Sequence, residues 1–180
     1  MFAYLLVLVA VASRVLPHPL MNFTAVGGSL LFFGARRKGW QRVLPVLALA
    51  ATDFYLTVFA YGYAFHVADY LVTWAWYAGV ALLGAAMLSK RASFLRVVGA
   101  VLGSATSFFL VSNFAVWVGS QMYAHTAAGL ATCYAAAIPF YGNDLVSTGL
   151  VAGCAFGLPA LARKLTASLQ HSADNDIAAA

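Results

Sequence analysis

Charged side chains are scarce in this sequence. Only 8% of its 180 residues are Asp, Glu, Lys or Arg, whereas 63% are hydrophobic. A soluble domain carries about 25% charged residues. With so few charges the chain could not cover its surface in water, so lipid must be the solvent for much of it. The composition predicts an all-α integral membrane protein, and the length allows one compact bundle.

Cysteines and catalytic motifs are equally scarce. The two cysteines, Cys133 and Cys154, lack CxxC spacing, which argues against a disulfide framework or a structural zinc site. The sequence has no HExxH, GxSxG, P-loop or GxGxxG motif, so we expect no enzyme, no intrinsic cofactor and no ATP hydrolysis by this chain. Basic residues outnumber acidic ones by ten to five, but they form short clusters between apolar runs. We interpret them as topology signals and expect no nucleic-acid partner.

The apolar runs predict one transmembrane domain over residues 1–166, a six-transmembrane-helix bundle with both termini in the cytoplasm. A helix needs about 20 residues to cross the hydrocarbon core, and the first two runs fall short of that length. A polar cytoplasmic tail is expected over 167–180. The alternative of a cleaved signal peptide over residues 1–13 lacks the basic start that such peptides carry. The six expected helices cover residues 2–17, 22–36, 41–64, 70–89, 94–119 and 143–163.

The positions of the basic residues decide the number of crossings. Lys and Arg near helix ends stay on the cytoplasmic side. Connections 17–23, 64–69 and 120–142 contain neither residue, and an even number of crossings puts nine of the ten basic residues on one face. A seventh crossing inside 120–142 would put Arg163 and Lys164 outside. We therefore predict that 120–142 is an outer loop with a helical piece lying over or dipping into the outer face.

Repeated glycines predict where helices pack closely. Gly149, Gly153 and Gly157 recur every four residues, and Gly99 and Gly103 share the same spacing. Small residues on one face let helix backbones approach each other in a membrane. We predict close packing at Gly27-Gly28 as well, the alternative being that the pair loosens the start of the short second helix.

Polar residues gather in the three outer loops. Tyr and Trp crowd the same end, where an interfacial aromatic belt would also place them. A small-molecule site combines an apolar, aromatic wall with a few polar anchors, so we predict a pocket that is open to the outside. The candidate substrate-binding residues are His18 and Asn22 in the first loop, His66 and Asp69 in the second, and Tyr123, His125, Asn143 and Asp144 in the third.

Three polar residues are expected within the membrane. Asp53 falls near the middle of the third helix, where a charge costs about 2.5–3.5 kcal/mol on insertion scales. It should be paired, neutral or facing a wet cavity, and Arg14 is its candidate partner. Asn113 near the outer end of the fifth helix suits a helix–helix hydrogen bond or a ligand contact.

Several segments carry a resemblance to a bacterial family of small membrane proteins. They are Arg14–Pro19 followed by Asn22–Thr24, Ser112–Trp117, and the Tyr123–Tyr134 region with its His125-Thr126 pair. That family in turn looks like the substrate-binding S components of energy-coupling-factor vitamin transporters. The resemblance implies six helices, cytoplasmic termini, a location in the bacterial inner membrane, and a pocket beneath the outer loops that binds a scarce micronutrient for import.

A solitary subgroup of the S components that this family looks like carries cobalamin, and in this sequence His66 stands at about the place of its loop after the third helix. A side chain of that loop ligates cobalt, and the resemblance implies that His66 takes this role as an axial ligand, since imidazole binds cobalt well. The subgroup is associated with cysteine at the cobalt-ligating position, so His66 is a departure from its pattern. S components that share an ATPase module often carry small residues four apart on the first helix, where this chain pairs Ala3 with Val7 and Ala10 with Arg14. The need for an energy-coupling module is therefore left open.

Two other functions stay open. The outer histidines and acids could bind or transport a bare transition-metal ion, which requires His18, His66 and His125 to lie within a few ångströms of one point. The chain could also be an assembly subunit without a ligand of its own. That function predicts a filled outer end and tolerance of substitutions at His66.

Overall fold

A computed structural model describes residues 1–17 and 19–178, with side chains up to residue 170. Over these residues the chain is helical, and no strand occurs in them. Short 3₁₀ turns precede the third and fourth long helices, at Gly39–Arg42 and Val67–Tyr70, and a π-helical turn, η2 (Leu56–Ala60), extends the third. The six α-helices are α1 (Phe2–Val15), α2 (Val26–Arg36), α3 (Val43–Tyr55), α4 (Leu71–Leu88), α5 (Phe94–Gly119) and α6 (Ala127–Ala178).

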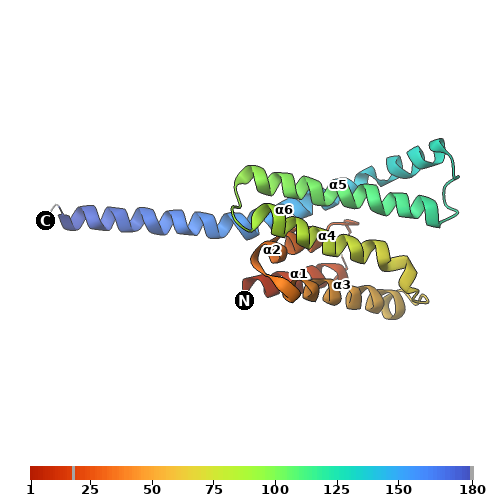
Figure 1. The fold of residues 1–180 in the computed structure, drawn as a ribbon, viewed down its shortest axis with the longest axis horizontal. Helices are drawn as coiled ribbons and strands as arrows, with labels where there is room; N and C mark the ends of the chain where they lie inside the picture. Colours follow the sequence, from red (N-terminus) through yellow and green to blue (C-terminus); the bar gives the residue numbers. More distant parts are fainter. Residues whose placement is uncertain (18, 179–180) are drawn as a thin grey trace.

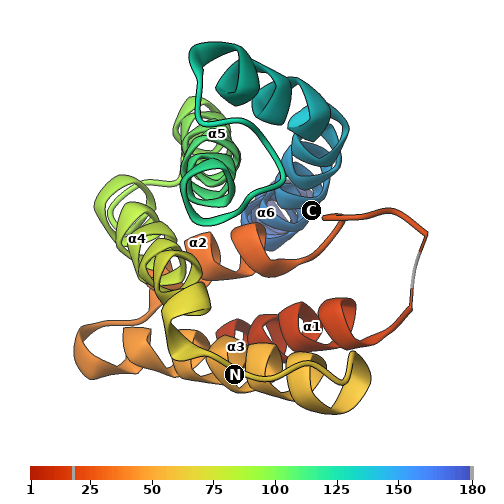
Figure 2. The same cartoon turned by 90° about the vertical axis from the view of Figure 1, so that its right-hand side faces the viewer.

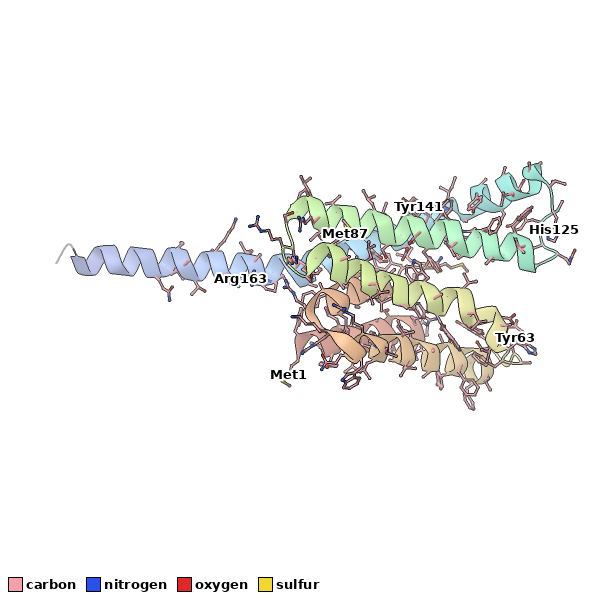
Figure 3. All side chains as sticks on the ribbon, viewed as in Figure 1. Met1, Tyr63, Met87, His125, Tyr141 and Arg163 are labelled. Carbon is pink, nitrogen blue, oxygen red and sulfur yellow. The ribbon has the colours of Figure 1, made fainter. Side chains whose placement is uncertain are left out.

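Consecutive helices run in opposite directions along the bundle (Figure 1). Met1 and Arg163 lie toward one end, and Tyr63 and His125 lie at the other (Figure 3). The basic clusters of 36–42, 90–96 and 163–164 therefore share the first end, which we call the basic end. The opposite end is called the far end. This separation of charge follows the pattern on which the topology prediction rests.

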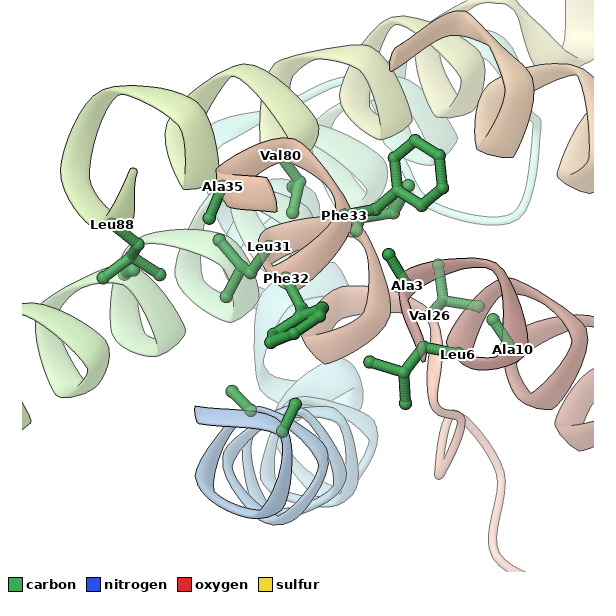
Figure 4. Close-up of a cluster of buried hydrophobic side chains, with 14 of the residues drawn as sticks. Ala3, Leu6, Ala10, Val26, Leu31, Phe32, Phe33, Ala35, Val80 and Leu88 are labelled. Carbon is green, nitrogen blue, oxygen red and sulfur yellow. The ribbon is translucent and has the colours of Figure 1, made fainter. Parts of the chain in front are cut away.

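Helix α2 forms the centre of the bundle. All but one of its eleven residues are buried, and it packs against α1, α4, α5 and α6. Figure 4 shows Phe33 of α2 pointing toward α1, while Phe32 points toward α6, where its ring packs against Phe156 with centroids 4.9 Å apart. A Cβ added to Gly34 would lie 1.8 Å from the Ala81 carbonyl oxygen of α4, so this glycine lets the two backbones touch.

The glycine face predicted on the last helix does not make the closest contacts. A Cβ at Gly153 or Gly157 would meet nothing within 4 Å, and one at Gly149 would meet only Val101 at 3.8 Å. Cβ atoms at Gly99 and Gly103 would contact α4 side chains at 3.4 Å, an ordinary distance. The tightest crossings involve Gly27, Gly28 and Gly34 of α2 and Gly84 of α4, and close packing at Gly27-Gly28 agrees with the sequence prediction. The four-residue spacing of glycines thus predicted a face of α5 that packs against α4, but the corresponding face of α6 is largely open.

The structure differs from expectation over residues 120–142. Only 120–126 are non-helical, and α6 then runs without a break through Pro139 and Pro159 to Ala178. The expected helical piece and the expected helix over 143–163 are thus one helix, whose teal and blue parts run in different directions in Figure 2. A proline inside a helix removes one backbone hydrogen bond and bends the helix, but does not have to end it. Helix α6 also continues through most of the expected tail and extends beyond the basic end (Figure 1).

Four helical segments are long and apolar enough to cross a membrane, namely Gly39–Ala60, Val67–Leu88, Phe94–Gly119 and Ala127–Gln170. Large apolar side chains such as Leu8, Leu47 and Leu150 are exposed on the outside of the bundle. Exposed apolar surface of this extent fits a lipid environment. Helices α1 and α2, with 14 and 11 residues, are below the usual spanning length, so six crossings remain a prediction.

Candidate functional site

An ion pair joins α1 to α3 inside the far half of the bundle. Arg14 Nη2 donates to Asp53 Oδ1 at 2.6 Å, and the Asp53 side chain is only 3% exposed. Trp74 Nε1 of α4 donates to Asp53 Oδ2 at 2.9 Å, while Arg14 Nη1 donates to Tyr77 Oη at 3.0 Å. The pairing predicted between Arg14 and Asp53 is present. Each carboxylate oxygen has a donor, which is what a buried charge requires.

The unequal lengths of two helices bring this pair together. Helix α1 ends at Val15, so Arg14 stands at its last turn. The helix that carries Asp53 continues through η2 to Ala60, so Asp53 lies well below its far end. Thr57 Oγ1 in η2 donates to the Asp53 carbonyl oxygen at 2.7 Å and contacts the Tyr70 hydroxyl. π-helical turns are rare and often occur at functional sites.

Beside this ion pair the far half of the bundle is hollow. An outer cavity of about 680 Å³ is rimmed by exposed side chains that include Leu16, Met21 and Tyr61. An inner cavity of about 250 Å³ reaches Asp53 and Asp144, and a side cavity of about 90 Å³ reaches Asp144 from the α5 side. Asn22 lines all three, and we call the three together the hollow.

The loop that carries Asn22 is fixed at several points. Asn22 has φ of 59°, a left-handed conformation that Asn adopts more readily than most residues. Asn143 Nδ2 of α6 donates to the Met21 carbonyl oxygen at 2.9 Å, and the Ala25 amide donates to Ser13 Oγ at 3.0 Å. The loop is thereby tied to α1 and α6, with Asn22 between the cavities.

Asp144 is the second buried acid of the hollow. Its side chain is 5% exposed, and Oδ1 accepts a long hydrogen bond of 3.4 Å from Thr148 Oγ1. Oδ2 has no hydrogen-bond partner within the described part of the chain, and neither does buried Ser104 Oγ. A Cβ on Gly27 would lie 2.4 Å from Thr148 Oγ1 and 3.2 Å from Ser104 Oγ, so these hydroxyls gather at one place. Unpaired buried polar groups require an explanation, and a ligand contact is one.

Two of the eight candidate substrate-binding residues line the hollow, namely Asn22 and Asp144. Asn143 supports the loop instead of lining a cavity. The Asn113 amide donates to the Phe109 carbonyl oxygen of its own helix at 2.7 Å, and the residue also borders the side cavity. His18 lies outside the described residues.

The remaining candidates lie on the loops of the far end. His66 is exposed, and His125 Nε2 lies 3.3 Å from the Ser120 carbonyl oxygen with its ring against Trp117. Neither these residues nor half-buried Tyr123 line the hollow. Exposed Asp69 borders a separate groove between α4 and α5. Among the residues described, no three His, Cys, Asp or Glu side chains are placed to hold a metal ion.

The sequence interpretation missed the polar contacts of α4. The sequence predicts only an aromatic wall at this end, yet Trp74 and Tyr77 of α4, and Tyr70 in the turn before it, direct indole and hydroxyl groups toward the Arg14–Asp53 pair and Thr57. Their spacing of four and three residues puts them on one helix face, which was a usable signal. Thr24 and Phe108, which line the inner cavity, had no such signal.

The fold and the hollow define a class: an all-helical membrane protein with a polar, aromatic-walled hollow at one end of its bundle. Within that class, the chain belongs to a family of unknown function, DUF6580, whose model matches residues 1–170. No curated protein and no solved structure matches the chain.

Proposed function

We propose that this protein is an S-component-like carrier of the bacterial inner membrane, which binds a scarce organic micronutrient in the hollow and moves it inward. The observation that carries the proposal is the hollow itself. Asn22 lines each of its three cavities, and the inner cavity has the Arg14–Asp53 pair and Asp144 in its wall. Ligand pockets of about 300–1,000 Å³ combine apolar walls with a few polar groups, and the outer cavity falls in that range.

Two observations favour an organic ligand over the other functions. A bare metal ion needs several ligating side chains at one point, and none of the described residues form such a group. An assembly subunit without a ligand predicts a filled far end, whereas the outer cavity alone measures about 680 Å³. Intramembrane ionisable residues also tend to mark substrate or ion pathways.

Cobalamin, or another corrinoid, is the leading proposal for the substrate and rests on the sequence resemblance. His66 would act as the axial cobalt ligand from the exposed loop between η2 and Val67–Tyr70. His66 does not line the hollow, so a bound corrinoid would have to extend from the outer cavity to His66. Ala3 and Ala10 of α1 are buried in the bundle, so they are not displayed to a coupling module.

Mass spectrometry of small molecules that copurify with the protein tests the binding function. Thr24 lines both the outer and inner cavities, so Thr24→Trp should fill them. Met122→Trp adds the same side chain on the exposed loop of the far end and serves as a matched control. We expect one compound to be enriched with the wild type and with the control, but not with Thr24→Trp. Equal recovery of that compound from all three proteins would refute binding in the hollow.

The corrinoid proposal has its own readout. Wild-type protein from corrinoid-fed cells should be coloured, and His66→Ala should change its absorption spectrum. A colourless protein that binds no corrinoid would eliminate this substrate while leaving the pocket itself to the copurification result.

A further inference from the structure

The charges around the inner cavity do not balance. Its wall contains Arg14, Asp53 and Asp144. Arg14 and Asp53 neutralise each other at 2.6 Å. No Lys or Arg within the described side chains lies within 4.0 Å of Asp144, so the ionised wall carries one unmatched negative charge. A buried carboxylate of this kind needs a cation or a hydrogen-bond donor nearby.

Asp144 Oδ2 is placed to meet such a group. The side chain is 95% removed from solvent, given its 5% exposure, and it borders both the inner and the side cavity. Oδ1 receives one long hydrogen bond from Thr148, whereas Oδ2 receives none from the described protein atoms. One oxygen is thus held by the helix and the other is left for a partner from the cavity.

An aromatic wall faces the same cavity. Trp76 and Phe108 both line it, with ring centroids 4.5 Å apart. Trp76 Nε1 donates to Ser107 Oγ at 3.0 Å, which holds the indole in place. Aromatic faces attract cations through the ring quadrupole, most strongly where water is excluded. Carboxylate and aromatic rings in one small cavity are the combination that suits a flat, positively charged group.

We propose that the inner cavity binds the cationic nitrogen group of an organic ligand, with an N–H donating to Asp144 Oδ2 and a flat ring packing against Trp76 and Phe108. This inference rests on the proposed function and names the ligand class of that site. A volume of about 250 Å³ is below the usual small-molecule range of about 300–1,000 Å³. The cavity therefore admits one ring-sized group, and the rest of a larger ligand lies in the outer cavity.

Three probes of nearly equal shape separate charge from fit. Benzamidine is flat and cationic with N–H donors, benzamide is its neutral counterpart, and benzoate is anionic. Isothermal titration of each probe into the purified full chain measures the preference directly. We expect benzamidine to bind at least about tenfold more tightly than benzamide, as a charged hydrogen bond implies. Benzoate should bind most weakly.

Variants then assign the preference to one side chain. Asp144→Asn keeps the shape but removes the charge, so the advantage of benzamidine over benzamide should disappear. Asp69→Asn removes an exposed acid outside the hollow, and the preference should persist. The comparison of the three probes on the wild-type protein tests the preference for a cation even if a variant fails to fold.

Several results would overturn the cation proposal. They are benzamide binding as tightly as benzamidine, a preference that survives Asp144→Asn, or no binding of any probe. A copurified compound that depends on Thr24 but has no cationic nitrogen, a corrinoid included, would also overturn it. That last result would leave the carrier function standing, so failure of the ligand class is distinguishable from failure of the pocket.

Discussion

The ion pair between Arg14 and Asp53 allows the sharpest test of how the helices are held together. The perturbation is a double-mutant cycle of Asp53→Asn, Arg14→Gln and the double variant. Asn at position 53 can still accept a hydrogen bond from Trp74 but cannot balance the Arg14 charge. Gln at position 14 removes that charge and leaves the buried carboxylate with one donor.

The expected magnitude follows from burial. Removing one partner of a buried ion pair costs about 3–5 kcal/mol. Asp53 is 3% exposed, whereas Arg14 is 20% exposed and borders the outer cavity, so solvent screens part of the interaction. We expect each single variant to lose about 2–3 kcal/mol of unfolding free energy. The double variant should lose little more than either single variant, which gives a coupling energy of about 1.5–2.5 kcal/mol.

Reversible unfolding in detergent micelles, followed by tryptophan fluorescence, measures these free energies. Trp74 contacts Asp53 and reports on the site itself. Asp69→Asn combined with Arg14→Gln is the matched control, because Asp69 is exposed and has no ion pair with Arg14 in the structure. The control pair should be additive within about 0.5 kcal/mol. Additive losses for Arg14 and Asp53 as well would refute the reasoning.

Three further predictions use the same unfolding assay. Gly34→Ala should lower the unfolding free energy by at least about 2 kcal/mol, because its Cβ would meet the α4 backbone. Gly153→Ala places its Cβ in open space and should change the unfolding free energy by less than about 1 kcal/mol. Equal effects of the two substitutions would contradict the α2–α4 contact. Asp144→Asn should raise the unfolding free energy by about 1 kcal/mol or more, because it removes a buried carboxylate whose Oδ2 has no partner among the described residues. A large loss of unfolding free energy would mean that the carboxylate has a stabilising partner within the protein. Tyr77→Phe should cost about 1 kcal/mol through the hydroxyl that accepts from Arg14, and no measurable change would count against that bond.

The membrane class and most helix positions could be predicted because hydropathy is a local property. Stretches of about 20 apolar residues indicate spans wherever they occur, and the basic clusters at 36–42 and 90–96 share one end of the bundle as expected. The Arg14–Asp53 contact could also be predicted, since a buried acid needs a partner and few bases are available.

Other features depend on tertiary packing that no local pattern records. The sequence predicts 120–142 as an outer loop with a helical piece because a seventh crossing would put Arg163 and Lys164 outside. In the structure residues 127–142 are helical and continue through Pro139 as part of α6. Helix α2 is enclosed by other helices on most sides, which hydropathy alone does not show.

The candidate site was only partly predictable for the same reason. Polarity and loop position favoured the histidines, but His66 and His125 lie on exposed loops. The hollow instead joins Asn22 and Asp144, which are far apart in sequence and meet because α6 supports the Asn22 loop. Their proximity depends on how the loop before α2 and helix α6 are arranged in three dimensions.

Thiol labelling in intact cells most directly tests the claim that the hollow faces away from the basic end. Asn22→Cys places a thiol between the cavities, and Lys164→Cys places one at the basic end, each with the two native cysteines replaced by alanine. A membrane-impermeant maleimide should label position 22 in intact cells and position 164 only after lysis. Labelling of both positions from the same side of the membrane would contradict the account.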